Sequence, residues 1–103
     1  MIQGTLDMLV LKVLAVEPMH GWGITKRIQQ ASEGTLEVNQ GSLYTGLLRM
    51  ARAGWIKSEW RTTENNRRAK YYGLTRTGEK QLQKEEERWA RMTSAVHQIL
   101  ALN

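Results

Sequence analysis

The chain has 103 residues, with 15 Lys and Arg against 10 Asp and Glu, so its formal net charge is +5. This length suits one compact domain. The absence of cysteine excludes disulfides, thiolate zinc sites and cysteine nucleophiles. No apolar run reaches the ~20 residues of a membrane-spanning helix, and residues 1–4 lack the features of a secretory signal. We therefore expect a cytoplasmic protein that avoids membranes and binds a polyanion such as nucleic acid.

The first predicted helix covers residues 5–16 and is apolar on two sides. One side repeats at helical spacing (Leu6, Leu9, Val10, Val13, Leu14), and Met8, Leu11 and Ala15 lie opposite. A helix of this kind needs two covers, and we expect a second subunit to supply one of them. Pro18 ends the helix, because proline disfavours helical geometry in the residue before it.

Two further helices are predicted before residue 55. One covers residues 21–32 and is closed by Gly34, and the other covers residues 42–53, with Ser42 as its N-cap and Gly54 at its end. The helix over 42–53 is amphipathic. Its predicted buried face holds Leu43, Tyr44, Leu47, Leu48, Met50 and Ala51, and its predicted exposed face holds Ser42, Thr45, Gly46, Arg49, Arg52 and Ala53.

A β-hairpin follows, because residues 55–61 alternate in polarity and residues 69–74 return to strand-like composition after a polar stretch. Trp55 and Trp60 are predicted to form or cover the core of this hairpin. A last helix begins at Thr75 or Thr77 and continues to about residue 101. Its apolar residues have near-heptad spacing, and no other helix of the chain is long enough to cover them. A homodimer is therefore predicted, with an interface formed by Leu6, Met8, Leu11, Leu82, Trp89, Met92, Val96, Ile99 and Leu100.

The excess positive charge is concentrated in residues 37–75, which hold seven basic and three acidic residues. This segment contains the helix over 42–53 and the hairpin. Three helices followed by a hairpin is the element order of a winged helix-turn-helix domain, whose third helix enters the major groove of DNA. The predicted fold is therefore mainly α with a small β-hairpin. Residues 1–75 would form the winged helix-turn-helix and residues 76–103 a dimerisation helix.

Several motifs resemble those of the PadR-like transcriptional regulators. They are residues 3–12 (Gln-Gly-Thr-Leu-Asp-Met-Leu-Val-Leu-Lys), 19–24 (Met-His-Gly-Trp-Gly-Ile), 41–47 (Gly-Ser-Leu-Tyr-Thr-Gly-Leu), 54–56 (Gly-Trp-Ile) and 67–78 (Arg-Arg-Ala-Lys-Tyr-Tyr-Gly-Leu-Thr-Arg-Thr-Gly). The resemblance implies a dimeric DNA-binding repressor of the short branch, with one C-terminal helix per subunit. Thr45 replaces the family's usual proline, and Trp22 stands where tyrosine is common. Both departures affect positions that could contact DNA.

The predicted DNA contacts of the helix over 42–53 are Ser42, Thr45 and Arg49, with Gln40 just before it. A helix N-terminus can hold a phosphate, and an arginine one turn later can reach O6 and N7 of guanine. The structural alternative makes Ser42 a cap and Arg49 a surface charge. Tyr44 has two interpretations, a core aromatic with a hydrated hydroxyl or, as the resemblance implies, a phosphate contact.

The hairpin tip supplies the other predicted DNA contacts, which are Asn65, Asn66, Arg67, Arg68 and Lys70. They would meet phosphates or the minor groove, although a solvated turn has the same composition. Trp89 is predicted to be an interface residue. As an alternative, Trp89 and Met8 would line a pocket for a small aromatic effector, as in some family members.

Two other functions compete with a palindrome-binding repressor. One is a ligand- or protein-binding dimer without sequence-specific DNA binding, suggested by Thr45 and Trp22. The other is an enzyme, for which the chain offers no catalytic constellation. Neither His20 nor His97 belongs to a cluster spaced for a metal, and no cofactor is predicted.

Overall fold

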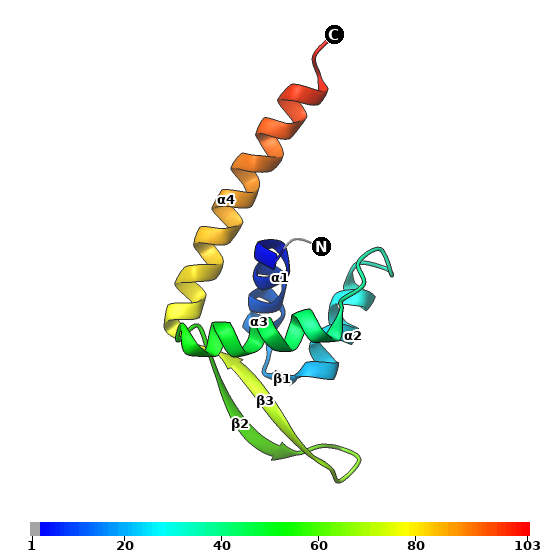
Figure 1. Cartoon of the computed structure of the whole chain (residues 1–103), viewed down its shortest axis with the longest axis vertical. Coiled ribbons are helices and arrows are strands. Elements are labelled where there is room, and N and C mark those ends of the chain that lie inside the picture. The colour runs from blue at the N-terminus through cyan, green and yellow to red at the C-terminus, as the bar shows by residue number, and fades with distance from the viewer. Residues whose placement is uncertain (1–2) are drawn as a thin grey trace.

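A computed structural model describes residues 3–103 of the chain (Figure 1). Met1 and Ile2 lie outside the described residues. They are the first residues of the winged helix-turn-helix predicted over 1–75 and of the segment 1–4, which is expected to lack a secretory signal. The elements in order are α1 (Gln3–Val16), β1 (Met19–His20), α2 (Gly21–Ala31), α3 (Gln40–Arg52), β2 (Ile56–Thr62), β3 (Arg68–Leu74) and α4 (Arg76–Leu100). The predicted helices and hairpin are confirmed, with ends within two residues of the predicted ones.

The hairpin belongs to a three-stranded antiparallel sheet with the order β1-β3-β2. Strand β1 was not predicted. It pairs Met19 with Tyr72 and His20 with Tyr71, and two residues are too few to show a period in the sequence. His20 then caps α2, because its Nδ1 accepts a hydrogen bond from the amide of Gly23 at 3.0 Å. The base of the wing is thus tied to the start of α2.

Helix α1 lies at the centre of the molecule and contacts α2, α3, β3 and α4 (Figure 1). Leu6 and Leu11 are therefore buried by their own chain, and so is Leu82 of α4. These three predicted interface residues are therefore core residues of a single chain, whereas Met8 and Ala15, on the same side of α1 as Leu11, stay partly or fully exposed. The core holds Leu6, Val10, Leu11, Leu14, Ile24, Ile28, Leu43, Leu47, Met50, Ile56, Tyr72 and Leu82.

Side-chain caps define where α3 and α4 begin. Asn39 caps α3 by accepting from the amide of Ser42 at 3.0 Å, so the predicted cap at Ser42 is wrong by three residues. Thr75 caps α4, because its Oγ1 accepts from the amide of Gly78 at 3.0 Å and donates to the carbonyl of Trp55 at 2.9 Å. Of the two predicted starts of this helix, the structure selects Thr75.

Helix α4 leaves the body of the molecule at the end opposite the wing (Figure 1). The molecule is 58 Å long as a result. Beyond the contact with α1, the apolar residues of α4 are exposed: Trp89, Met92, Val96, Ile99 and Leu100. None of the helices within residues 3–103 combines the length and the apolar character needed to cross a membrane.

Candidate nucleic-acid interface

The outward side of α3 differs from the predicted one. Tyr44 and Leu48, predicted to be buried, have 50% and 54% of their surface exposed, and Gly46, predicted to be exposed, is buried. Thr45 is exposed, as predicted. The helix is therefore rotated relative to the predicted setting. Its exposed residues are Gly41, Ser42, Tyr44, Thr45, Leu48 and Arg52.

Arg49 contacts α1 instead of pointing outward with Thr45. One of its guanidinium nitrogens, Nη2, donates to Oδ1 of Asp7 at 2.7 Å, and the two side chains are 38% and 11% exposed. This hydrogen bond raises the pKa of Arg49 above its ordinary value, against a smaller opposing effect of burial. The ion pair links α3 to α1 across 42 residues of sequence. A contact between Arg49 and guanine stays a prediction and would compete with this pair.

Removing Arg49 is expected to destabilise the fold more than removing its partner. Arg49→Ala leaves the nearly buried Asp7 carboxylate without its guanidinium, which should lower the free energy of unfolding by about 1–3 kcal/mol. Asp7→Asn keeps an acceptor and should cost about 1 kcal/mol or less. Urea unfolding measures both. The control Arg52→Ala, on the outward side of the same helix, should stay within about 0.5 kcal/mol, and equal losses in all three variants would contradict the role of the pair.

The other two candidates near the start of α3 have structural contacts. The Gln40 side chain donates from Nε2 to Oγ1 of Thr25 at 2.7 Å, which ties α3 to α2. Ser42 lies inside the first turn with its side chain exposed. Both residues therefore lie near the exposed side of α3, but the side-chain amide of Gln40 already donates its hydrogen bond to Thr25.

The tip of the wing is a turn with its own hydrogen bonds. The amide of Arg67 donates to Oγ1 of Thr63 at 3.2 Å, and Asn66 adopts a φ of 59°. Asn tolerates this left-handed conformation better than most residues. Asn66 thus shapes the turn, while Asn65 and Arg67 flank it.

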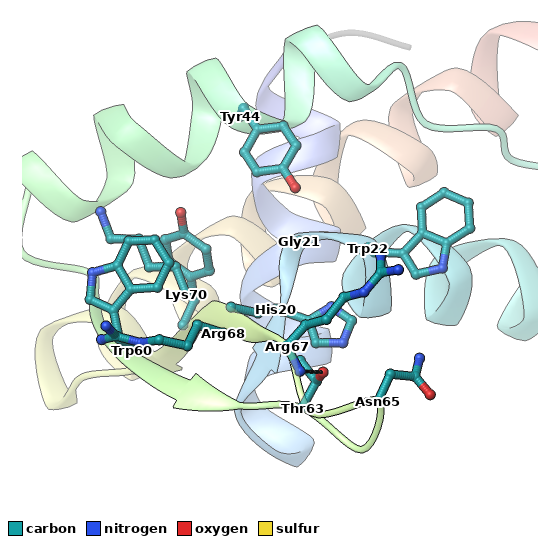
Figure 2. Close-up of a pocket in the computed structure, with 12 residues that line it drawn as sticks. His20, Gly21, Trp22, Tyr44, Trp60, Thr63, Asn65, Arg67, Arg68 and Lys70 are labelled. Carbon is teal, nitrogen blue, oxygen red and sulfur yellow. Dashed lines mark hydrogen bonds between the residues drawn. The ribbon is translucent and has the colours of Figure 1, made fainter.

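A cleft of about 530 Å³ separates the wing from α2 and α3 (Figure 2). Among the described residues that line it, none is acidic. Five predicted DNA contacts meet there, namely Tyr44, Asn65, Arg67, Arg68 and Lys70. The other five predicted contacts, Gln40, Ser42, Thr45, Arg49 and Asn66, do not line it. The cleft is also lined by His20, Gly21, Trp22, Trp60, Thr63, Ala69 and Tyr72.

Trp60, which was predicted to form or cover the core of the hairpin, lines the cleft. Its side chain is 59% exposed, so it is not part of a hairpin core. Trp55, in contrast, packs against the core as predicted. Strand alternation placed Trp60 correctly on one face of the hairpin, but only the tertiary structure shows that this face lies open to the cleft.

Tyr44 extends from α3 toward the start of α2, and its hydroxyl points into the cleft (Figure 2). A Cβ atom at Gly21 would lie 2.5 Å from this hydroxyl, so the close approach depends on glycine. Across the cleft, burial raises the pKa of Tyr72, and the nearby Tyr44 adds a smaller effect in the same direction. With half of its surface exposed, Tyr44 is not the core aromatic with a hydrated hydroxyl of the first interpretation, and the phosphate contact stays a prediction.

Trp89 and Met8 line two small cavities on the other side of the molecule, between α1 and α4. One has a volume of about 170 Å³ and also contacts Glu85 and Met92. The other has a volume of about 260 Å³ and also contacts Leu82. The two residues predicted to share a pocket are therefore neighbours within a single chain.

The fold is shared with solved structures of transcriptional regulators. A PadR family transcriptional regulator from Eggerthella lenta is 30% identical, with a TM-score of 0.83 over 97% of this chain and 85% of that one. A PadR family transcription regulator from Clostridium difficile is 26% identical, with a TM-score of 0.78 over 93% and 98% of the two chains. A transcriptional regulator from Clostridium thermocellum is 25% identical, with a TM-score of 0.85 over 92% and 89%.

The family profile supports the same assignment. The profile described as the transcriptional regulator PadR-like family matches residues 10–84, from α1 through the wing to the first part of α4. Its members are described as transcriptional regulators. The motifs at the start of α2, at the start of α3 and in the wing, which resembled this family in sequence, all line or border the cationic cleft. The chain belongs to the PadR-like family of transcriptional regulators.

Proposed function

We propose that the protein is a homodimeric repressor that binds a palindromic operator in duplex DNA. The observation that carries this proposal is the cationic cleft next to the outward side of α3. A helix in the major groove and a wing beside it require both surfaces to face the duplex together. Arg67, Arg68 and Lys70 supply the charge that phosphates attract. Tyr44 and Asn65 supply hydrogen-bonding groups to the same cleft.

The exposed apolar side of α4 supports the dimer. Residues 76–103 would form the subunit contact and residues 1–75 the DNA-binding unit of each copy. In such a dimer the cavities beside Trp89 would come close to the two-fold axis, where a small aromatic effector could enter. Repression would require only that the dimer occupies its operator. The proposed location is the cytoplasm, together with the DNA that the dimer would bind.

The experiment is a fluorescence anisotropy titration of a duplex selected from a random library. The variant Arg67→Ala/Arg68→Ala should lose about 10- to 100-fold in affinity at 0.15 M salt. Its log–log salt slope should fall by about 3.6, because the dimer loses two phosphate contacts in each of its two subunits and each lost contact removes about 0.9. The variant Lys84→Ala/Arg91→Ala removes the same charge from exposed positions of α4 and serves as the control.

The control should keep the affinity within about threefold and keep most of the salt slope, since its charges lie far from the cleft. Equal losses in both double variants would show that only net charge matters and would contradict the site. A wild-type protein that selects no duplex would favour the second candidate function, a ligand- or protein-binding dimer. Two departures from the family pattern described above motivate this alternative, namely Thr45 in place of proline and Trp22 in place of tyrosine.

A further inference from the structure

The two faces of the wing carry different charge patterns. Residues paired across antiparallel strands point to the same side, so the register puts Trp60 opposite Lys70, with Arg68 on the same side, facing the cleft. The opposite face carries Glu59, which forms an ion pair with Arg61. Within the part of the chain that the structure describes, no carboxylate forms an ion pair with Arg68 or Lys70. The cations on the cleft side are therefore available to an external anion.

Trp60 and Arg68 form a stacked pair within this face. The guanidinium carbon of Arg68 lies 5.5 Å from the centre of the Trp60 ring, within the range of a cation–π interaction. Figure 2 shows the two side chains together beside Lys70. Tryptophan is the aromatic ring that attracts cations most strongly. The stack restricts the rotation of a long side chain that would otherwise move freely in solvent.

A restricted guanidinium is well suited to one particular ligand. Its planar fork of N–H donors matches the oxygens of a phosphate, and stacking leaves the donor edge open. Ordering the side chain before binding also removes part of the entropic cost of binding. The pair therefore has the properties of a preformed phosphate-binding element.

The position of the cleft identifies the source of the phosphate. When α3 lies in the major groove and the wing reaches the adjacent minor groove, one sugar–phosphate strand runs between them. The cleft lies between Tyr44 of α3 and the wing. Its volume of about 530 Å³, its cations and its lack of acidic lining residues suit a segment of that strand.

We propose that Trp60 is a positioning residue that holds the guanidinium of Arg68 for one phosphate of the DNA strand seated in this cleft. This inference rests on the proposed function. It assigns to Trp60 no contact with bases and no charge of its own. Its effect on DNA affinity must therefore pass through Arg68.

A double-mutant cycle in DNA affinity tests this dependence. Trp60→Ala should weaken binding about two- to fivefold per subunit, the size of an exposed cation–π interaction, and so about 4- to 25-fold for the dimer. The salt slope should be unchanged because no charge is lost. Arg68→Ala should weaken binding further and reduce the slope by about 1.8, because one phosphate contact is lost in each subunit. The double variant should bind about as well as Arg68→Ala alone. Trp60→Phe should restore part of the loss, because phenylalanine also presents an aromatic face.

A matched cycle controls for a general effect of tryptophan. Trp22 also lines the cleft and is 58% exposed, but it lies near Lys26 and not near Arg68. The losses from Trp22→Ala and Arg68→Ala should therefore be additive. Thermal unfolding followed by circular dichroism should show that Trp60→Ala stays folded, since its side chain is mostly exposed.

The outcomes separate the inference from the function on which it rests. Additive losses in the Trp60 and Arg68 cycle, or a Trp60→Ala variant that binds like the wild type, would overturn the positioning role alone. A wild-type protein that binds no duplex specifically would overturn the proposed function and this inference with it.

Discussion

Introducing two glutamates into the exposed side of α4, as Val96→Glu/Ile99→Glu, is expected to convert the proposed dimer into monomers. Both side chains are exposed in the single chain, so the substitutions should not disturb its own core. In a dimer they would place like charges in an apolar contact, where a charge without a partner is costly. The proposed operator affinity should fall by about a hundredfold or more, because the two half-sites would no longer be bound by one linked molecule.

Light scattering coupled to size exclusion measures the first effect, and anisotropy with the selected duplex measures the second. The wild type should have about twice the chain mass of 11.8 kDa, and the variant should have the mass of one chain. Ser94→Glu/Gln98→Glu adds the same charge to exposed positions on the other side of α4 and should remain a dimer. A variant that keeps the mass and the affinity of the wild type would contradict the assignment of the interface.

Replacing Gly78 by alanine is expected to be the most destabilising single substitution in the wing-to-α4 junction. An added Cβ would overlap the carbonyl of Trp55 and lie 2.6 Å from Cδ1 of Leu74. The carbonyl belongs to the backbone and also accepts from Thr75, so it cannot move away at low cost. The expected loss is about 3 kcal/mol or more in the free energy of unfolding.

Urea denaturation followed by far-ultraviolet circular dichroism measures this loss. Gly4→Ala is the matched control, since Gly4 also lies in a helix but has nothing near its Cβ position. Alanine should be neutral or stabilising there by up to about 1 kcal/mol. A Gly78→Ala protein as stable as the wild type would show that α4 does not pack closely on Trp55.

The sequence predicted the order of the four helices and of the two hairpin strands because each of these had a local signal, whereas the two-residue strand β1 had none. Pro18 and Gly54 ended helices, and the alternation in residues 55–61 indicated the strand that the structure places at Ile56–Thr62. The concentration of charge in residues 37–75 also pointed to the surface that the structure shows, since Arg67, Arg68 and Lys70 lie together in one cleft.

The rotation of α3 could not be read from its own residues. Tyr44 and Leu48 widen the apolar face of the helix. Two rotations of α3 about its axis, one that buries these residues and one that exposes them, therefore fit the sequence almost equally well. The contact with α1 decides between them. Gly46 comes close to Asp7, whose Oδ1 would be 3.5 Å from an added Cβ, and Arg49 then reaches the same carboxylate. These contacts join residues about 40 positions apart, beyond the reach of any local period.

The misassigned interface residues have a similar cause. A helix with apolar residues on two sides must pack against other residues on both sides. The sequence pattern does not say whether these residues belong to the same chain or to a second subunit. Leu11 is fully buried because α1 lies at the centre of its own fold. The exposed residues of α4 from Trp89 onward lack such a cover in the single chain, and there the dimer prediction stays a proposal.

Selection of binding sites from a random duplex library at 0.15 M salt tests the central proposal most directly. A dimer that presents two α3 helices to the same side of a duplex should enrich a palindrome. Its half-sites should be centred about one helical turn (~34 Å) or a multiple of it apart. Recovery of unselected sequence after repeated rounds, with the protein folded and dimeric, would contradict sequence-specific DNA binding by this surface.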